Sequence, residues 1–163
     1  MREAREADPR SAYLVGDGTL LPFPDALFDV VVSYNSLQDV DDMPAAVREA
    51  ARVLRDNGRF CVCVVHPIRD AGSFVSEEGD AAFSISDYFE ARLYDESFER
   101  DGLQMTFTSW RYSIEGYARA LEDASFLVER VREPLPDRKA TGPRHERSQR
   151  IPAFLFMRAV KST

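Results

Sequence analysis

Apolar residues along the chain follow two different patterns. Three runs rich in β-branched and aromatic residues lack polar alternation, and they predict strands over 28–33, 60–65 and 154–160. Strands of this kind are typically buried on both faces of a sheet. A shorter run over 127–131 predicts a fourth strand.

Two segments show helical spacing instead. Between the first two strands, apolar residues from Met43 to Leu54 fall on one helical face, and Pro44 stands where a first-turn proline is tolerated. Asp41 and Asp42 lie at the positive end of this helix. A second helix is predicted after Ser113, whose hydroxyl can cap it. The order strand, helix, strand predicts a right-handed parallel crossover.

The remaining segments carry weaker patterns. Residues 2–7 predict the end of a helix, and residues 13–15 predict a short strand that is closed by Gly16-Asp17-Gly18. Residues 133–151 predict a loop rich in proline and arginine.

Composition narrows the class of protein. The 163 residues, with 44% hydrophobic and 30% charged side chains, suit a single soluble domain over 1–163. No apolar run approaches the ~20 residues of a membrane helix, and no signal peptide opens the chain, so we expect a cytoplasmic protein that does not bind membranes. A net charge of −7 disfavours nucleic acid as a partner.

The net negative charge is concentrated in residues 68–110. This segment holds ten acidic and three basic residues, and eight of the chain's aromatic side chains. We therefore expect it to form a distinct unit within the domain.

No metal site is predicted. Cys61 and Cys63 lack the spacing of a zinc or redox motif, and we expect them to be core thiols. His145-Glu146 begins like a metalloprotease helix, but Gln149 occupies the position of the second histidine.

Three loops are predicted at the edge of the sheet where ligands bind in open α/β folds, beyond the carboxyl ends of the strands. They are Gly16-Asp17-Gly18, the residues after Ser33, and His66-Pro67. Glycines beside Asp17 permit close approach of a flat ligand, and its carboxylate can accept a hydrogen bond from an exocyclic amine such as that of adenine. A plain turn is the alternative interpretation of these three residues.

Four sequence stretches resemble a known family. They are Gly16-Asp17, Leu21-Pro22-Phe23-Pro24, Phe28-Asp29-Val30-Val31-Val32-Ser33, and the helix end from Glu49 to Phe60 that contains Arg52-Val53-Leu54-Arg55. Together they resemble the class I S-adenosylmethionine-dependent methyltransferases that act on small molecules. Residues 111–134 are similar to the last helix and sixth strand of that family. The resemblance implies a Rossmann-like α/β sheet of parallel strands with an antiparallel C-terminal strand, and S-adenosylmethionine as cofactor.

The resemblance also implies roles for individual residues. Asp17 should bind the adenine amine, and the backbone of Gly18 should meet the ring edge. The methionine part of the cofactor should lie against Ser33, Tyr34 and Asn35, with Leu37 packed nearby. A polar cap at the end of the strand is the alternative role for residues 33–35.

One departure from the family changes the expected assembly. The family's glycine-rich loop after its first strand, and the acidic residue that ends its second strand, have no counterpart here, so we expect a chain shortened at its N-terminus. The family's strand order, 3-2-1-4-5-7-6, then leaves strand 28–33 at a sheet edge. Exposed apolar edges recruit partners, so we expect a homodimer or a neighbouring strand that covers this edge.

We expect the binding site for the molecule that accepts the methyl group at the end of strand 60–65 and in segment 68–110. His66 is of a residue type that commonly serves as a catalytic base, or it caps the chain before Pro67. Family members often carry a substrate lid at the position of residues 68–110. Its rings Tyr88, Phe89, Tyr94 and Trp110 either enclose the acceptor or form a satellite core.

The sequence therefore predicts a methyltransferase that transfers a methyl group from S-adenosylmethionine to a small molecule. The alternative is a non-catalytic, methyltransferase-like binding or dimerisation module.

Overall fold

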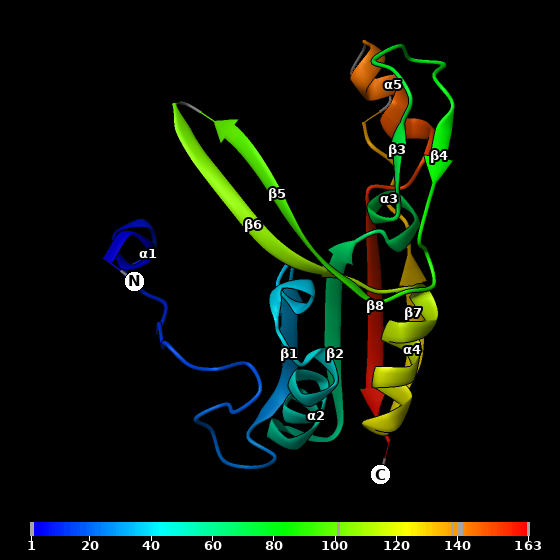
Figure 1. The fold of residues 1–163 in the computed structure, drawn as a ribbon. Coiled ribbons are helices and arrows are strands. Elements are labelled where there is room, and N and C mark those ends of the chain that lie inside the picture. Colours follow the sequence, from blue (N-terminus) through cyan, green and yellow to red (C-terminus); the bar gives the residue numbers. More distant parts are fainter. Residues whose placement is uncertain (1, 101, 138, 140–141, 163) are drawn as a thin grey trace.

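The central element of the protein is a four-stranded mixed sheet (Figure 1). The computed structural model describes residues 2–100, 102–137, 139 and 142–162. The strands run in the order β1, β2, β8, β7, and their bounds are Phe28–Tyr34, Leu54–Val65, Phe154–Lys161 and Phe126–Arg132. β1 and β2 are parallel, and β8 is antiparallel to both β2 and β7. This mixed sheet confirms the predicted Rossmann-like fold class.

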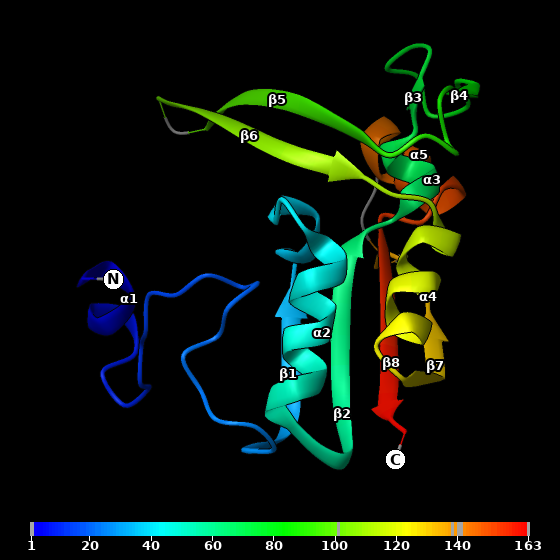
Figure 2. The ribbon, with the colours of Figure 1, turned by 60° about the horizontal axis from the view of Figure 1, so that its bottom comes forward.

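Two helices cover one face of the sheet (Figure 2). They are α2 (Met43–Val53) and α4 (Ile114–Asp123), and both begin where the sequence predicts. The Asp42 carboxylate accepts a hydrogen bond from the Ala45 amide at 2.8 Å, and the Ser113 hydroxyl accepts one from Gly116 at 3.1 Å. These caps satisfy amides that no helical carbonyl can reach. The helices bury their apolar stripes against Phe60, Leu155 and other residues of β2 and β8, which forms the core.

The opposite face of the sheet is open in the described part of the chain. The prediction that residues 28–33 are buried on both faces is wrong: Val30 and Val32 are exposed, Val32 to 65%. Successive side chains of a strand point to opposite faces, and α2 and α4 cover only one of them. Val31 therefore packs against the core while its neighbours on either side do not.

β1 is an edge strand, as predicted, since it pairs only with β2 in the described sheet. The segment before it is irregular. α1 (Arg2–Ala7) lies apart from the sheet, and an irregular segment leads from it to β1 (Figure 1), so that the strand predicted over 13–15 does not form. Val15 is 75% exposed, and an isolated bridge between Asp17 and Leu20 is the pairing found nearby. A strand needs a hydrogen-bonded neighbour, and no described strand lies beside residues 13–15.

Segment 67–111 projects beyond the carboxyl ends of β1 and β2 (Figures 1 and 2). It contains a short helix and two hairpins, whose elements are α3 (Pro67–Asp70), β3 (Gly72–Phe74) with β4 (Phe83–Ile85), and β5 (Arg92–Arg100) with β6 (Leu103–Arg111). A short 3-10 helix, η1 (Leu37–Asp39), lies below the second hairpin and is joined to it: the Ser109 hydroxyl donates to the Asp39 carboxylate at 2.6 Å.

Part of the loop predicted over 133–151 is helical. α5 spans Pro143–Arg150, and two of its arginines, Arg147 and Arg150, bind the β3–β4 hairpin. The Arg147 guanidinium donates to the Ser76 carbonyl at 2.8 Å, and that of Arg150 donates to Ala81 at 2.6 Å. These contacts come from residues some 70 positions away, so local sequence did not predict the helix. None of the described helices has the length and apolar character needed to cross a membrane.

Replacement of Asp42 by alanine tests the N-cap of α2. We expect the free energy of unfolding, measured by urea denaturation, to fall by about 1 kcal/mol because the Ala45 amide loses its partner. Asp41→Ala is the matched control, since it removes a neighbouring carboxylate outside the cap. Equal losses in the two variants would contradict the assignment of the cap.

Candidate functional site

The ends of β1 and β2 are held side by side. The Asn35 amide donates to the Cys63 carbonyl at 2.9 Å and so extends the parallel ladder one residue beyond β1. Asn35 itself has a left-handed backbone, with φ of 48°, which turns the chain out of the sheet. The Ser33 hydroxyl lies 3.0 Å from that of Ser36. Backbone and hydroxyl groups are therefore gathered at the carboxyl end of β1.

The two other residues predicted here lie apart from this loop. Tyr34 is exposed on the open face of the sheet, and Leu37, the first residue of η1, is buried in the core. The structure thus brings together Ser33 and Asn35 at the strand end, with Leu37 below them. Tyr34 points to the face that α2 and α4 leave uncovered.

The Gly16-Asp17-Gly18 segment forms a tight turn. Asp17 Oδ1 accepts hydrogen bonds from the Thr19 amide and the Thr19 hydroxyl, both at 2.8 Å. These bonds lower the pKa of the exposed Asp17 carboxyl, so it is charged at neutral pH. A Cβ at Gly18 would lie 3.8 Å from Val40, the residue that follows η1. The turn therefore lies close to the segment that follows β1, as a shared ligand site requires.

Two residues of α2 anchor the segment that carries this turn. The Arg52 guanidinium donates to the carbonyl oxygens of Leu21 and Phe23 at 3.0 and 2.8 Å. Glu49 accepts the Leu21 amide at 2.8 Å and also pairs with Arg52, which lowers the pKa of the Glu49 carboxyl. Sequence reasoning missed this anchor, because a Glu–Arg pair three positions apart on a helix ordinarily indicates only a surface ion pair.

His66, at the end of β2, is fully buried. Its Nδ1 accepts a hydrogen bond from the Ile68 amide at 3.2 Å, and its Nε2 donates to a Glu133 carboxylate oxygen at 2.8 Å. Because both ring nitrogens are engaged, this geometry favours the capping role over that of a base. The catalytic role of His66 stays a prediction.

A cavity of about 470 Å³ lies between α3, β3 and the base of the β5–β6 hairpin. The Tyr94 hydroxyl donates to Asp70 Oδ1 at 2.6 Å, and the Arg111 guanidinium lies over the Tyr94 ring at 4.2 Å. Burial raises the pKa of the Asp70 carboxyl, although Tyr94 and Arg111 oppose the shift. Burial also raises the pKa of Tyr94, with the Asp70 charge adding to the effect. A partly buried carboxylate with a perturbed pKa in a cavity marks a candidate binding site.

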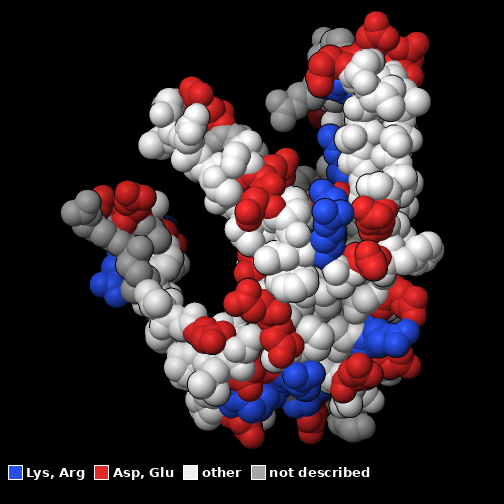
Figure 3. All heavy atoms as spheres, viewed as in Figure 1, with Lys and Arg blue, Asp and Glu red and all other residues white. Residues whose placement is uncertain are grey.

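The four aromatic residues predicted for the acceptor divide between the two interpretations. Tyr94 lines this cavity, whereas Trp110 stacks on Tyr112 with ring centroids 6.2 Å apart. The Tyr88 hydroxyl accepts the Ile114 amide at 3.2 Å, and Phe89 is 88% exposed. Acidic side chains are gathered along the β5–β6 hairpin, to which Tyr94 and Trp110 belong (Figure 3). Tyr94 thus fits the enclosure of a ligand, and Trp110 fits the satellite core.

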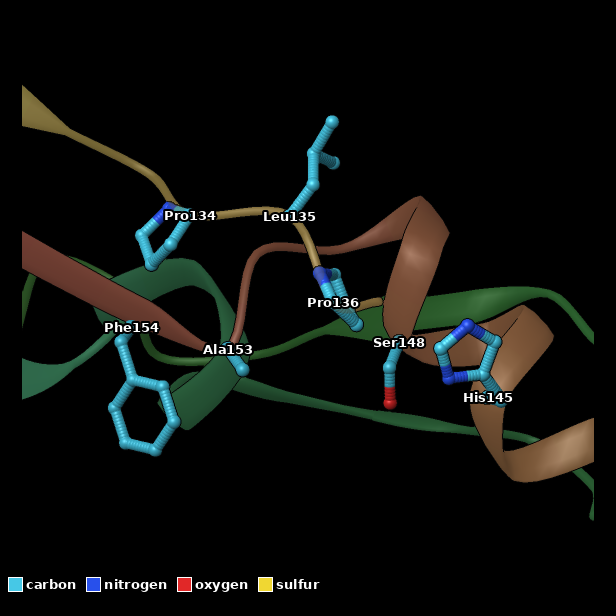
Figure 4. A pocket seen from close by; sticks show the side chains of 7 residues that line it. All are labelled: Pro134, Leu135, Pro136, His145, Ser148, Ala153 and Phe154. Carbon is cyan, nitrogen blue, oxygen red and sulfur yellow. The ribbon is translucent and has the colours of Figure 1, made fainter. Parts of the chain in front are cut away.

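A second cavity of about 560 Å³ lies beyond the end of β7 (Figure 4). It is lined by Pro134, Leu135, Pro136, Ala153 and Phe154, with His145 and Ser148 from α5. His145 Nε2 lies 2.7 Å from the Gln149 amide nitrogen, which donates to it. The walls of this cavity are mainly proline and apolar residues, so it could enclose an apolar group but presents few polar groups to a ligand. Sequence reasoning missed it because it depends on α5.

Comparison with known proteins finds that this chain is similar to methyltransferases. The model of a family described as "Methyltransferase domain" matches residues 1–62. A ubiquinone/menaquinone biosynthesis C-methyltransferase (UbiE) of a Caulobacter species is 34% identical over 122 residues, which are 72% of this chain and 46% of that protein. A 27-O-demethylrifamycin SV methyltransferase of Amycolatopsis mediterranei is also 34% identical, over 76% of this chain and 50% of the relative.

Solved structures share the fold. An S-adenosylmethionine-dependent methyltransferase of Mesorhizobium loti superposes with a TM-score of 0.77 at 23% identity, covering 98% of this chain and 74% of the other. The chain spans about half the length of the curated relatives that it matches.

Replacement of Asp70 by asparagine tests whether the charge of this partly buried carboxylate lowers the free energy of unfolding. A raised pKa means that the folded protein binds this proton more tightly than the unfolded chain does, so stability falls as pH rises through that window. The asparagine side chain keeps an acceptor for the Tyr94 hydroxyl without the charge. We therefore expect Asp70→Asn to have a higher free energy of unfolding than the unmodified protein at about pH 7.

The gain should disappear at acidic pH, where Asp70 is protonated in both states. Asp80→Asn, which removes an exposed carboxylate of the same segment, is the control and should change little. Urea denaturation at several pH values measures the difference. Lower stability of Asp70→Asn at neutral pH would show instead that Tyr94 and Arg111 outweigh the burial of the charge.

Proposed function

We propose that this chain, which is related by sequence and by fold to the class I S-adenosylmethionine-dependent methyltransferases, binds S-adenosylmethionine and serves methyl transfer to a small molecule. One observation carries the proposal. In a sheet of the methyltransferase type, the Asp17 turn lies close to the segment that follows β1 and its Ser33–Asn35 loop. Arg52 and Glu49 of α2 anchor the chain between the turn and β1 through Leu21 and Phe23.

The residues present fit two parts of the cofactor. The charged Asp17 carboxylate suits the adenine amine, and the open turn at Gly18 leaves room for the ring edge. Backbone and hydroxyl groups of Ser33 and Asn35 suit the polar methionine end. When bound, S-adenosylmethionine supplies a methyl group on an electrophilic sulfonium. The contribution of the chain is to bind and orient the two partners, which is the main requirement of this chemistry.

The acceptor is proposed to bind under segment 68–110, which would serve as a lid. Support comes from its position beyond the ends of β1 and β2, and from the cavity that Tyr94 lines. In this proposal Trp110 stiffens the base of the lid, Tyr88 joins the lid to α4 through its bond with the Ile114 amide, and Phe89 lies at the outer surface. The free thiols Cys61 and Cys63 support a cytoplasmic location, where thiols stay reduced.

Calorimetric titration with S-adenosylhomocysteine tests cofactor binding. We expect Asp17→Asn to weaken binding about 10-fold, because asparagine keeps the Thr19 hydrogen bonds but loses the charge that strengthens the bond to an amine. Asp8→Asn is the matched control: Asp8 is also exposed and also holds a turn, through Arg10 and Ser11.

An unchanged affinity of Asp17→Asn for S-adenosylhomocysteine would contradict the proposal that Asp17 binds the adenine amine. Absence of binding to the unmodified chain at millimolar ligand would favour the second candidate function, a non-catalytic binding or dimerisation module. The exposed apolar strand β1 is the observation that favours this alternative.

We further propose that two copies of the chain associate through β1. Its outer edge is unpaired in the described sheet, and Val30 and Val32 are exposed beside a shallow apolar cavity of about 260 Å³ on the open face. An apolar edge with free backbone groups favours pairing with a second strand. A dimer would bury this edge and bring a second sheet close to the cofactor loops.

Light scattering measures the mass directly. We expect the mass of a dimer for the unmodified chain and that of a monomer for Val32→Asp, because a carboxylate on this face opposes its burial. Val75→Asp, at a residue that is 67% exposed in the β3–β4 hairpin segment, should leave the dimer intact. A monomer mass for the unmodified chain would contradict the proposal.

A further inference from the structure

The short helix η1 comes directly after the loop that is proposed to hold the methionine end of the cofactor. Its Asp39 amide donates to the Ser36 carbonyl at 3.1 Å, and the Ser36 hydroxyl lies 3.0 Å from that of Ser33. Val40, the next residue, lies 3.8 Å from the position that a Cβ would take at Gly18 in the proposed adenine turn. η1 and Val40 therefore lie beside both segments of the proposed cofactor site.

The same helix is joined to the β5–β6 hairpin. The Ser109 hydroxyl of β6 donates to the Asp39 carboxylate at 2.6 Å, and Ser109 is nearly buried, with 7% of its surface exposed. Tyr94, which stands opposite Ser109 in the hairpin, donates its hydroxyl to Asp70 of α3. The base of the hairpin is thus tied to the two segments that leave the carboxyl edge of the sheet, and β6 is tied to η1.

Beyond its base, the hairpin has no further strand to support it in the described part of the chain. β5 and β6 form a two-stranded sheet of their own, which projects from the rest of the molecule (Figures 1 and 2). Leu103 is 66% exposed and Phe107 is 45% exposed. A two-stranded hairpin is only marginally stable by itself, so the orientation of this one depends on the contacts at its base.

Two buried polar atoms at the junction have no hydrogen-bond partner among the described residues. They are Gln38 Oε1, an acceptor in the residue before Asp39, and Trp110 Nε1, a donor in the residue after Ser109. Burial of such atoms without a partner is unfavourable, and native structures contain few of them. A small displacement that gives either atom a partner is therefore favoured at this junction.

We propose that the Asp39–Ser109 hydrogen bond couples the cofactor site to the β5–β6 hairpin, so that cofactor binding repositions the base of the hairpin. The inference rests on the proposed function, because S-adenosylmethionine is the ligand that displaces the loop before η1. Asp39 and Ser109 act as positioning residues, and neither contacts the cofactor. The hairpin, which is part of the proposed lid, takes its place for the acceptor once the cofactor is bound.

The fluorescence of Trp110 reports on this junction. Trp110 is the single tryptophan of the chain and follows Ser109 directly in β6. We expect saturation with S-adenosylhomocysteine to shift the Trp110 emission of the unmodified chain, at the affinity that calorimetric titration gives for the same ligand. Saturation of binding with no change in Trp110 emission would overturn the proposal.

Variants at the junction test the hydrogen bond itself. Ser109→Ala and Asp39→Ala each remove it, and we expect both to lose most of the emission change. Affinity for S-adenosylhomocysteine should fall by no more than about 5-fold, the contribution of one ordinary hydrogen bond. Asp39→Asn keeps an acceptor oxygen for the Ser109 hydroxyl and should retain the emission change. An undiminished change in both alanine variants would contradict the role of this bond.

Ser97→Ala is the matched control. The Ser97 hydroxyl lies 2.8 Å from that of Thr106 on the same hairpin, further from its base. This variant also removes a serine hydrogen bond and should retain the emission change. Circular dichroism and thermal unfolding verify that each variant is folded. Equal losses of the emission change in Ser97→Ala and Ser109→Ala would contradict a specific link through η1.

A measurement without ligand distinguishes failure of this inference from failure of the proposed function. In the free chain, we expect Ser109→Ala to change the backbone amide chemical shifts of residues 33–36, and Ser97→Ala to leave them unchanged. Such changes in a chain that does not bind S-adenosylhomocysteine would support the link between hairpin and loop and overturn the proposed function. Binding of S-adenosylhomocysteine with neither the amide shift changes nor the emission change would overturn the coupling alone.

Discussion

The parallel pairing of β1 with β2 is the interaction on which the rest of this structure depends. Its register sets Tyr34 opposite Cys63, and the Asn35 amide adds a last bond to the Cys63 carbonyl. Both strands therefore end at one edge of the sheet, and the segments that follow them, η1 and α3, begin there. The loop at Ser33 and the cavity at Asp70 border this edge because the two strands run in the same direction. The turn at Asp17 precedes β1 and lies close to this edge at Val40.

The same sheet is strongly asymmetric. One face is closed by α2 and α4 with well-capped helix ends, whereas the other leaves Val30 and Val32 of the edge strand exposed. Apolar surface in this position favours association, and it lies on the strand that carries the proposed methionine site. Cofactor binding and self-association are therefore coupled in this account through one strand.

Sequence reasoning succeeded where local signals decide the structure. Asp42 with Pro44, and Ser113 before its apolar stripe, located both core helices, and the family resemblance supplied the strand order. Sequence reasoning failed where the local structure of a segment depends on its neighbours in the folded protein. Residues 13–15 have strand composition but no described neighbour to pair with, and α5 is held by contacts with a distant hairpin. At the site, the family resemblance pointed to Asp17, and His66 was predictable as a polar residue after a strand. The Glu49–Arg52 anchor and the Asp70–Tyr94 pair arise from tertiary contacts that no spacing encodes.

The central claim is that the carboxyl edge of the β1–β2 pair is the cofactor site. Backbone amide chemical shifts measured during titration with S-adenosylhomocysteine test it most directly. The account predicts shift changes at Asp17 and Gly18 and at residues 33–35, with little change at the far end of β2 near Asn57. Changes at the cavity beyond β7, or saturation of binding without any change at Asp17 and Asn35, would contradict it.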